Sequence, residues 1–97
     1  MIERHVTFHV LPGKGEAFAR FFEEAYRPAM EKTAGFIQAG LLKSREQAHD
    51  FTMTLRFDSL DAAAAWRTSP THQELKPHLK SLYNGSELKV FEIIIQE

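Results

Sequence analysis

The stretch from Trp66 to His72 holds the residues best suited to chemistry in this chain. A tryptophan offers a broad apolar ring that can hold a flat aromatic ligand, and a histidine can take up or release a proton near neutral pH. Helical spacing aligns the imidazole of His72 with three apolar side chains, those of Leu75, Leu79 and Leu82. A polar group on an apolar stripe needs a hydrogen-bond partner or a function.

Both residues also have a purely structural interpretation. Trp66 shares a helix stripe with Leu60 and Ala63 and can fill space in the core above small alanines. His72 can cap the start of its own helix or bond a backbone carbonyl. The two interpretations stay open at this stage.

The apolar residues around Trp66 and His72 predict a pocket between helices and sheet with few polar groups, the usual composition of a site for a flat hydrophobic molecule. Tyr26 adds a third polar tip, and His78 lies about a quarter-turn off the leucine stripe, at the rim. The candidate catalytic residues are His72 and Trp66. The candidate substrate-binding residues are Phe8, Tyr26, Met53, Leu55, Leu75 and His78.

The spacing of the other histidines argues against a metal site. His5 and His9 share a strand face, but ~13 Å separates their Cα atoms, too far for one ion. His72 and His78 are six residues apart on a helix, which places them about 240° apart around its axis. We therefore expect no metal.

Nucleotide and thiol chemistry are disfavoured as well. The segment Pro12-Gly13-Lys14-Gly15 lacks the spacing of a dinucleotide or phosphate loop and indicates a tight turn into a helix. The chain has no cysteine, which excludes a disulfide framework, a thiolate nucleophile and a cysteine-type zinc site.

Length and charge predict one small domain that binds neither nucleic acid nor an anionic membrane. The 97 residues are 43% hydrophobic and 26% charged, and 12 Lys and Arg stand against 13 Asp and Glu, for a net charge of −1. This balance gives no reason to bind nucleic acid or an anionic membrane. No apolar run approaches the ~20 residues that span a bilayer, and the N-terminus lacks a signal-peptide pattern. We expect a cytoplasmic protein with a single domain over residues 1–97.

Hydrophobic periodicity predicts four strands and three helical segments. Alternation in the first segment points Val6, Phe8 and Val10 to one face and His5, Thr7 and His9 to the other. The predicted strands are Arg4–Leu11, Phe36–Ser44, Phe51–Phe57 and Glu87–Gln96. The predicted helices run from Glu16 towards Gly35, from Leu60 to Thr68, and from Ser69-Pro70 to about Tyr83.

The sequence of the first predicted helix indicates a distortion within that helix. Its apolar stripe is Phe18, Phe21, Phe22, Ala25 and Ala29. Pro28 lies inside this pattern without an amide hydrogen, which predicts a kink or a looser last turn.

The order β-α-β-β-α-β indicates an α+β, ferredoxin-like fold, a four-stranded antiparallel sheet with the helices on one face. The helices then cover the face with Val6, Phe8 and Val10. The opposite face, with His5, Thr7, His9 and Arg56 among apolar neighbours, stays open. An uncovered, partly apolar sheet face usually finds a partner, so we expect a homodimer through this face.

Three stretches in this order resemble the antibiotic biosynthesis monooxygenase (ABM) domains of the dimeric α+β barrel superfamily, with the third similar to the W-x-x-S-x-x-H motif of that family. They are Pro12-Gly13-Lys14-Gly15-Glu16-Ala17-Phe18, Ala34-Gly35-Phe36 through Leu41-Leu42, and Trp66-Arg67-Thr68-Ser69-Pro70-Thr71-His72.

The resemblance implies a homodimer whose two sheets form a barrel, with a pocket in each subunit. It implies a monooxygenase that needs neither metal nor organic cofactor and oxidises an electron-rich aromatic such as a quinol or anthrone. In that interpretation Trp66 holds the substrate and His72 serves as base or hydrogen-bond donor.

Two alternatives accompany this interpretation. A haem-degrading branch of the family looks like it needs an Asn on the first strand, a helix Trp and an axial His. Trp66 matches, but the only Asn is Asn84, and Lys76 stands where the ligand is expected, between His72 and His78. Haem is therefore disfavoured. The other alternative is a dimeric ligand-binding or stress-response module without turnover, which fold alone does not distinguish.

Overall fold

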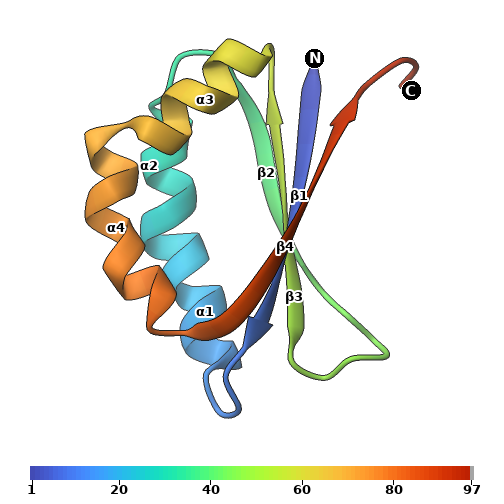
Figure 1. The fold of residues 1–97 in the computed structure, drawn as a ribbon. Coiled ribbons are helices and arrows are strands. Elements are labelled where there is room, and N and C mark those ends of the chain that lie inside the picture. The colour runs from blue at the N-terminus through green and yellow to red at the C-terminus, as the bar shows by residue number, and fades with distance from the viewer. Residues whose placement is uncertain (97) are drawn as a thin grey trace.

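The computed structural model describes residues 1–96, and Figure 1 shows a sheet with all helices on one of its faces. The elements follow each other as β1 (Ile2–Val10), α1 (Gly15–Phe21), a π-helical turn η1 (Phe22–Tyr26), α2 (Arg27–Glu31), β2 (Phe36–Lys43), β3 (Asp50–Phe57), α3 (Leu60–Thr68), α4 (Pro70–Lys80) and β4 (Tyr83–Glu92).

The four strands form one antiparallel sheet in the order β2-β3-β1-β4, which confirms the ferredoxin-like prediction. The central strands pair in the register Val6 opposite Met53 and Thr7 opposite Thr52. Because side chains alternate along a strand, this register places whole sets of apolar residues on one face. Along β3 every second residue is buried beneath the helices.

The core lies between this face and the helices. Its largest fully buried side chains come from α1, α2, β3 and α3; they are Trp66, Phe18, Phe57, Met30, Met53 and Leu55. The opposite face carries polar pairs, including a hydrogen bond between the hydroxyls of Thr7 and Thr52 (2.8 Å) and an ion pair from Arg56 Nε to Glu3 (2.9 Å).

The irregularity predicted at Pro28 appears one turn earlier, as the π-turn Phe22–Tyr26. Pro28 cannot donate to the carbonyl four residues before it, and the widened turn accommodates its ring. The extra residue in this turn moves the apolar stripe by one position. Tyr26 and Met30 are therefore buried, and the predicted stripe residues Ala25 and Ala29 are only partly buried.

The predicted boundaries of the last helix and strand were wrong. Helix α4 ends at Lys80, and β4 begins at Tyr83 and ends at Glu92. The segment 84–86, predicted to end the helix, belongs to β4: Ser86 pairs with Phe8, Tyr83 pairs with Val10, and the register shifts between these two pairs. Pairing with β1, which no local pattern encodes, thus sets this strand.

No helix among residues 1–96 is long and apolar enough to cross a bilayer.

Gly35, in the connection from α2 to β2, allows α3 to pack closely on this connection, because it has no Cβ. Its φ is +85°, and a Cβ there would lie 2.5 Å from the Ala62 Cβ and 2.6 Å from an Asp58 carboxylate oxygen. Gly13 has a similar φ of +80°, but nothing lies within 4 Å of its Cβ position. A substitution at Gly13 therefore introduces backbone strain alone, and one at Gly35 introduces backbone strain together with steric overlap.

We expect Gly13→Ala to lower the free energy of unfolding by ~1–2 kcal/mol, the cost of holding an alanine at positive φ. Gly35→Ala should cost ~1–3 kcal/mol more, because helix α3 must also move away. Urea unfolding followed by circular dichroism measures both. Equal losses in the two variants would contradict the proposed overlap with Ala62.

Candidate functional site

A pocket of about 220 Å³ opens between the helix-facing side of the sheet and the ends of η1, α3 and α4. Most of its wall is aromatic or aliphatic, with polar groups at a few points, as in binding sites for small molecules. The residues that line it are Arg4, Val6, Phe8, Tyr26, Leu55, Trp66, Arg67, His72, Lys76, Leu79, Tyr83 and Ser86.

Trp66 and His72 meet because the helix breaks between them. Six residues along a continuous helix would separate them by ~9 Å of rise and about 240° of rotation, which is ~120° by the shorter way round. In the structure their rings are 5.1 Å apart, at an interplanar angle of 73°. Helix α3 ends at Thr68 and α4 begins at Pro70, so the chain turns and brings both rings to one wall.

Ser69 holds this break with one hydroxyl. It donates to the carbonyl of Trp66 (2.8 Å) and accepts from the backbone N–H of His72 (3.1 Å). The same side chain thereby terminates α3 and caps α4, and Pro70 follows at a position that needs no N–H. In the motif of Trp, Ser and His at three-residue intervals, the serine thus positions the Trp and His rings next to each other.

Tyr26 completes an aromatic corner with these two residues. Its ring is 5.4 Å from that of Trp66 and 5.9 Å from that of His72, both edge to face. Burial raises the pKa of the Tyr26 hydroxyl, so it stays protonated at neutral pH. The Trp66 indole N–H lies near this hydroxyl but is buried outside hydrogen-bond geometry, without a partner among residues 1–96.

His72 is an uncharged base in this setting. Burial lowers its pKa below the ordinary value of 6.5, and the positive charges of Lys76, Arg4 and Arg67 lower it as well. The Arg67 carbonyl acts in the opposite direction, yet Nδ1 of His72 is buried without a hydrogen-bond partner in the described chain. Because Nδ1 is buried, the other ring nitrogen is the one that a molecule in the pocket can reach, and a neutral imidazole can accept a proton there.

Three cationic residues of this pocket were not among the candidate site residues predicted from the sequence. Arg4, Arg67 and Lys76 line it from β1, α3 and α4. The alternation of β1 contains the signal for Arg4, because this residue is in phase with Val6 and Phe8 and so faces the helices. The positions of Arg67 and Lys76 depend on the turn at Ser69.

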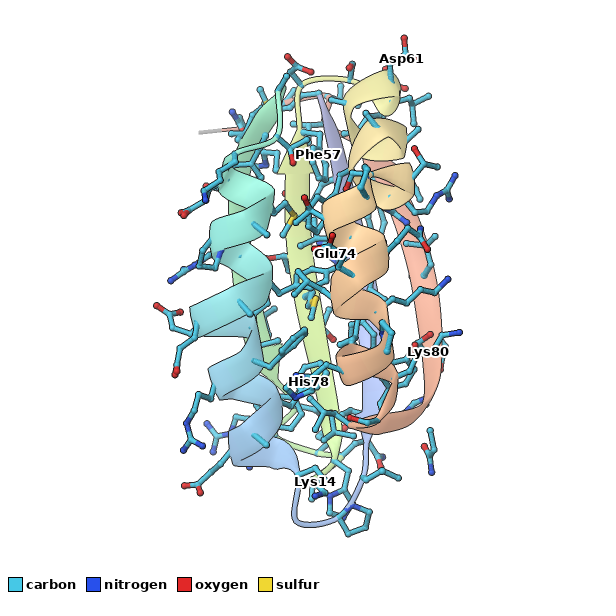
Figure 2. All side chains as sticks on the ribbon, turned by 90° about the vertical axis from the view of Figure 1, so that its left-hand side faces the viewer. Lys14, Phe57, Asp61, Glu74, His78 and Lys80 are labelled. Atoms are coloured by element: carbon cyan, nitrogen blue, oxygen red, sulfur yellow. The ribbon has the colours of Figure 1, made fainter. Side chains whose placement is uncertain are left out.

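The structure brings together five of the eight candidate residues, namely Phe8, Tyr26, Leu55, Trp66 and His72. It does not place the other three on the pocket wall. Met53 is fully buried in the core, and Leu75 is partly buried against it. His78 lies between α4 and α1 (Figure 2), with its ring 4.6 Å from that of Phe21.

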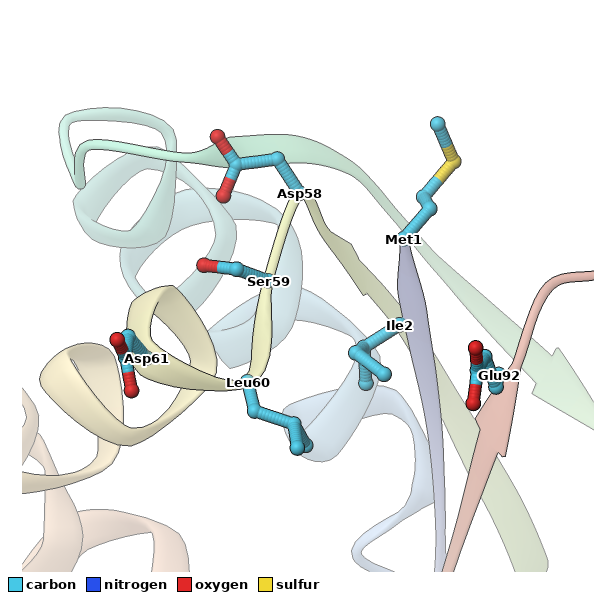
Figure 3. A pocket seen from close by; sticks show the side chains of 7 residues that line it. All are labelled: Met1, Ile2, Asp58, Ser59, Leu60, Asp61 and Glu92. Carbon is cyan, nitrogen blue, oxygen red and sulfur yellow. The ribbon is translucent and has the colours of Figure 1, made fainter.

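A second depression, about 390 Å³, lies at one end of the sheet (Figure 3). Its carboxylates come from the β3–α3 connection, α3 and β4, and they point apart rather than converging. No group of three or more potential metal ligands forms within residues 1–96. The pocket at Trp66 is therefore the candidate site. The residues of the second depression are Met1, Ile2, Asp58, Ser59, Leu60, Asp61 and Glu92.

A sequence model of the antibiotic biosynthesis monooxygenase (ABM) family matches residues 1–77. The chain belongs to the ABM family. The match covers β1 to most of α4 and includes Trp66, Ser69 and His72, which confirms the resemblance seen in the sequence. No curated protein matches this ABM domain at a significant level.

Solved structures share the fold of this ABM domain over nearly its whole length. A proposed antibiotic biosynthesis monooxygenase from Bordetella bronchiseptica is 19% identical, with 97% of each chain covered and a TM-score of 0.86. A protein of the same description from Deinococcus radiodurans is 16% identical, covering 100% of this chain and 96% of its own, with a TM-score of 0.85.

SnoaB, a cofactor-independent oxygenase from Streptomyces nogalater, is also similar to this ABM domain. It is 19% identical, with 98% of this chain and 94% of its own chain covered and a TM-score of 0.84. At such identities the likeness establishes the common fold, and function has to be argued from the site.

We expect the imidazole of His72 to titrate below pH 6.5 and that of His9 above it in one NMR titration of the five histidines. The shift of His9 has the opposite sign because it bonds Asp50 (2.7 Å) and Glu87 on the open face. Lys76→Met should raise the pKa of His72 and leave that of His9 in place.

The same titration fixes the sign of the stability effect. The unfolded chain binds a proton at His72 more readily than the folded one, so this group lowers stability as pH falls below about 6.5. His72→Gln should weaken that acid-side loss in urea unfolding. A His72 pKa above 6.5 would contradict the cationic, desolvated setting described for the pocket.

Proposed function

We propose that this protein is a cofactor-independent monooxygenase that oxidises a small electron-rich aromatic substrate in the pocket at Trp66. The observation that carries the proposal is the imidazole of His72, kept uncharged by burial and by nearby cations, in edge-to-face contact with Trp66 on the pocket wall. Family membership and the fold shared with SnoaB support it.

The chemistry assigned to these residues is proton transfer and orientation. His72 takes a proton from a ring CH₂ or hydroxyl, and Trp66 and Tyr26 hold the planar anion. The anion passes an electron to O₂ and recombines with it, and the imidazolium of His72 protonates the resulting peroxide. Loss of water then converts the CH₂ to a carbonyl, so that one O₂ yields one C=O and one H₂O.

Haem is a poorer fit to this pocket. A volume of about 220 Å³ is below the ~300–1,000 Å³ of sites for drug-sized ligands, and a haem macrocycle does not enter it as it stands. His78, one of the two imidazoles near the expected ligand position, is outside the cavity. A module that binds no small molecule would fill this volume, so the cavity at Trp66 and His72 favours a site for a small molecule, and the base on its wall favours the enzyme.

Oxygen uptake by the purified protein, without added metal or flavin, tests the oxygenase against a panel of naphthols, hydroquinones and anthrones. We expect His72→Ala to lower the enzyme-dependent rate about 10²-fold, because a positioned base contributes 10²–10⁴. Trp66→Phe should lower it less, since a smaller ring still contacts the substrate.

The matched control for this assay is His49→Ala, an exposed histidine in the β2–β3 connection, which should keep the wild-type rate. Urea unfolding of each variant shows whether a lost rate reflects a lost fold. Wild-type turnover in the Trp66→Phe, His72→Ala double variant would contradict the roles proposed for these two residues.

We further propose that the protein is a homodimer through the open sheet face. This face exposes Leu42 (57%) and Phe91 (45%), and the segment after β4 exposes Ile94 (79%) and Ile95 (86%). Apolar side chains exposed this far on a small domain favour a second copy of the chain as the partner. The dimer implied by the ABM resemblance uses the same face.

Leu42→Glu should therefore weaken the dimer at least tenfold in sedimentation or light-scattering measurements, because a carboxylate would be buried without a partner. Leu60→Glu is the matched control, since Leu60 is 63% exposed at the start of α3, on the helix side. A monomeric wild-type protein, or equal weakening by the two variants, argues against this interface.

A further inference from the structure

We propose that the substrate of this pocket is an aromatic acid, whose carboxylate is bound by Arg4 with Arg67 and Lys76 beside it. The inference rests on the proposed function, in which this pocket is the substrate site, and it names the class of substrate. It follows from a concentration of positive charge in the pocket that no residue of the described chain neutralises.

Arg4 is a partly buried cation without a counterion. It lies on the helix-facing side of β1, and burial together with the charge of Arg67 lowers its pKa. Within residues 1–96 no carboxylate lies within 4 Å of its guanidinium, although Arg56 and Arg27 on other surfaces pair with Glu3 and Glu23. A desolvated, unpaired guanidinium is costly unless an anion comes to it.

The remaining charges around the pocket have the same sign. Arg67 reaches it from α3 and Lys76 from α4, and the uncharged polar groups are those of Tyr26, Tyr83, Ser86, Trp66 and the neutral His72. None of its lining residues is Asp or Glu, in a chain with 13 acidic and 12 basic side chains. The excess is therefore local to the pocket.

The shape of the site selects among anions. A guanidinium offers a planar pair of donors that matches a carboxylate, and the adjoining wall of Trp66, Tyr26 and Phe8 accepts an apolar ring. A volume of about 220 Å³ restricts that ring system to a small one. A compact aromatic ring with a carboxylate satisfies both parts of the pocket.

Binding rather than turnover tests the inference. Calorimetry should show that the wild-type protein binds naphthalene-2-carboxylate at least tenfold more tightly than the uncharged isostere naphthalene-2-carboxamide, a ratio that corresponds to ~1.4 kcal/mol. Arg4→Met should reduce this preference to threefold or less. Arg67→Gln with Lys76→Gln should reduce it in part and weaken its dependence on salt.

Arg45→Met is the matched control, because it removes the same charge from the exposed β2–β3 connection and should leave the preference unchanged. Urea unfolding confirms that Arg4→Met is folded. Equal affinity for the two probes, no saturable binding of the carboxylate, or an undiminished preference in Arg4→Met would overturn the inference.

The two proposals fail separately. If the carboxylate preference depends on Arg4 but no aromatic acid supports oxygen uptake, the anion site stands and the oxygenase does not. If neutral quinols are oxidised with wild-type dependence on His72 and the carboxylate preference is absent, the oxygenase stands and the aromatic acid does not.

Discussion

The site depends on a single hydroxyl, that of Ser69. By bonding the Trp66 carbonyl and the His72 amide, it ends one helix and begins the next within one residue. The resulting turn brings the two rings to 5.1 Å, a contact that a continuous helix would prevent. The edge-to-face corner with Tyr26 and the approach of Lys76 both depend on this turn.

The positive charges around the pocket and the base on its wall are compatible, because the cations keep the imidazole uncharged. Lys76, Arg4 and Arg67 surround the imidazole of His72 and, with burial, keep it uncharged at neutral pH. The same cations attract an anion, which the imidazole can itself generate by taking a proton. A base held neutral by positive neighbours is thus electrostatically consistent with a substrate that becomes, or already is, negative.

The bounds of some elements could be predicted accurately from the sequence and those of others could not, for physical reasons. Strand β3 and helix α3 carry complete local signals, an alternation in one and a serine cap before an alanine-rich run in the other, and both were located to within a residue. Strand β4 was misplaced because its start is set by pairing of Tyr83 with Val10, a contact between distant segments. The π-turn shifted a correct helical stripe by one residue, from Ala25 to Tyr26.

The sequence by itself determined the order of elements, the two faces of the sheet, and the pairing of Trp66 with His72 as candidates, because periodicity and caps are local properties. Only the tertiary structure decided which candidates share a cavity. It separated His78 and Met53 from the site and added Arg4 to it. The physical reason is that a pocket wall is assembled from strands and helices far apart in the chain, and its charge is the sum of what they bring together.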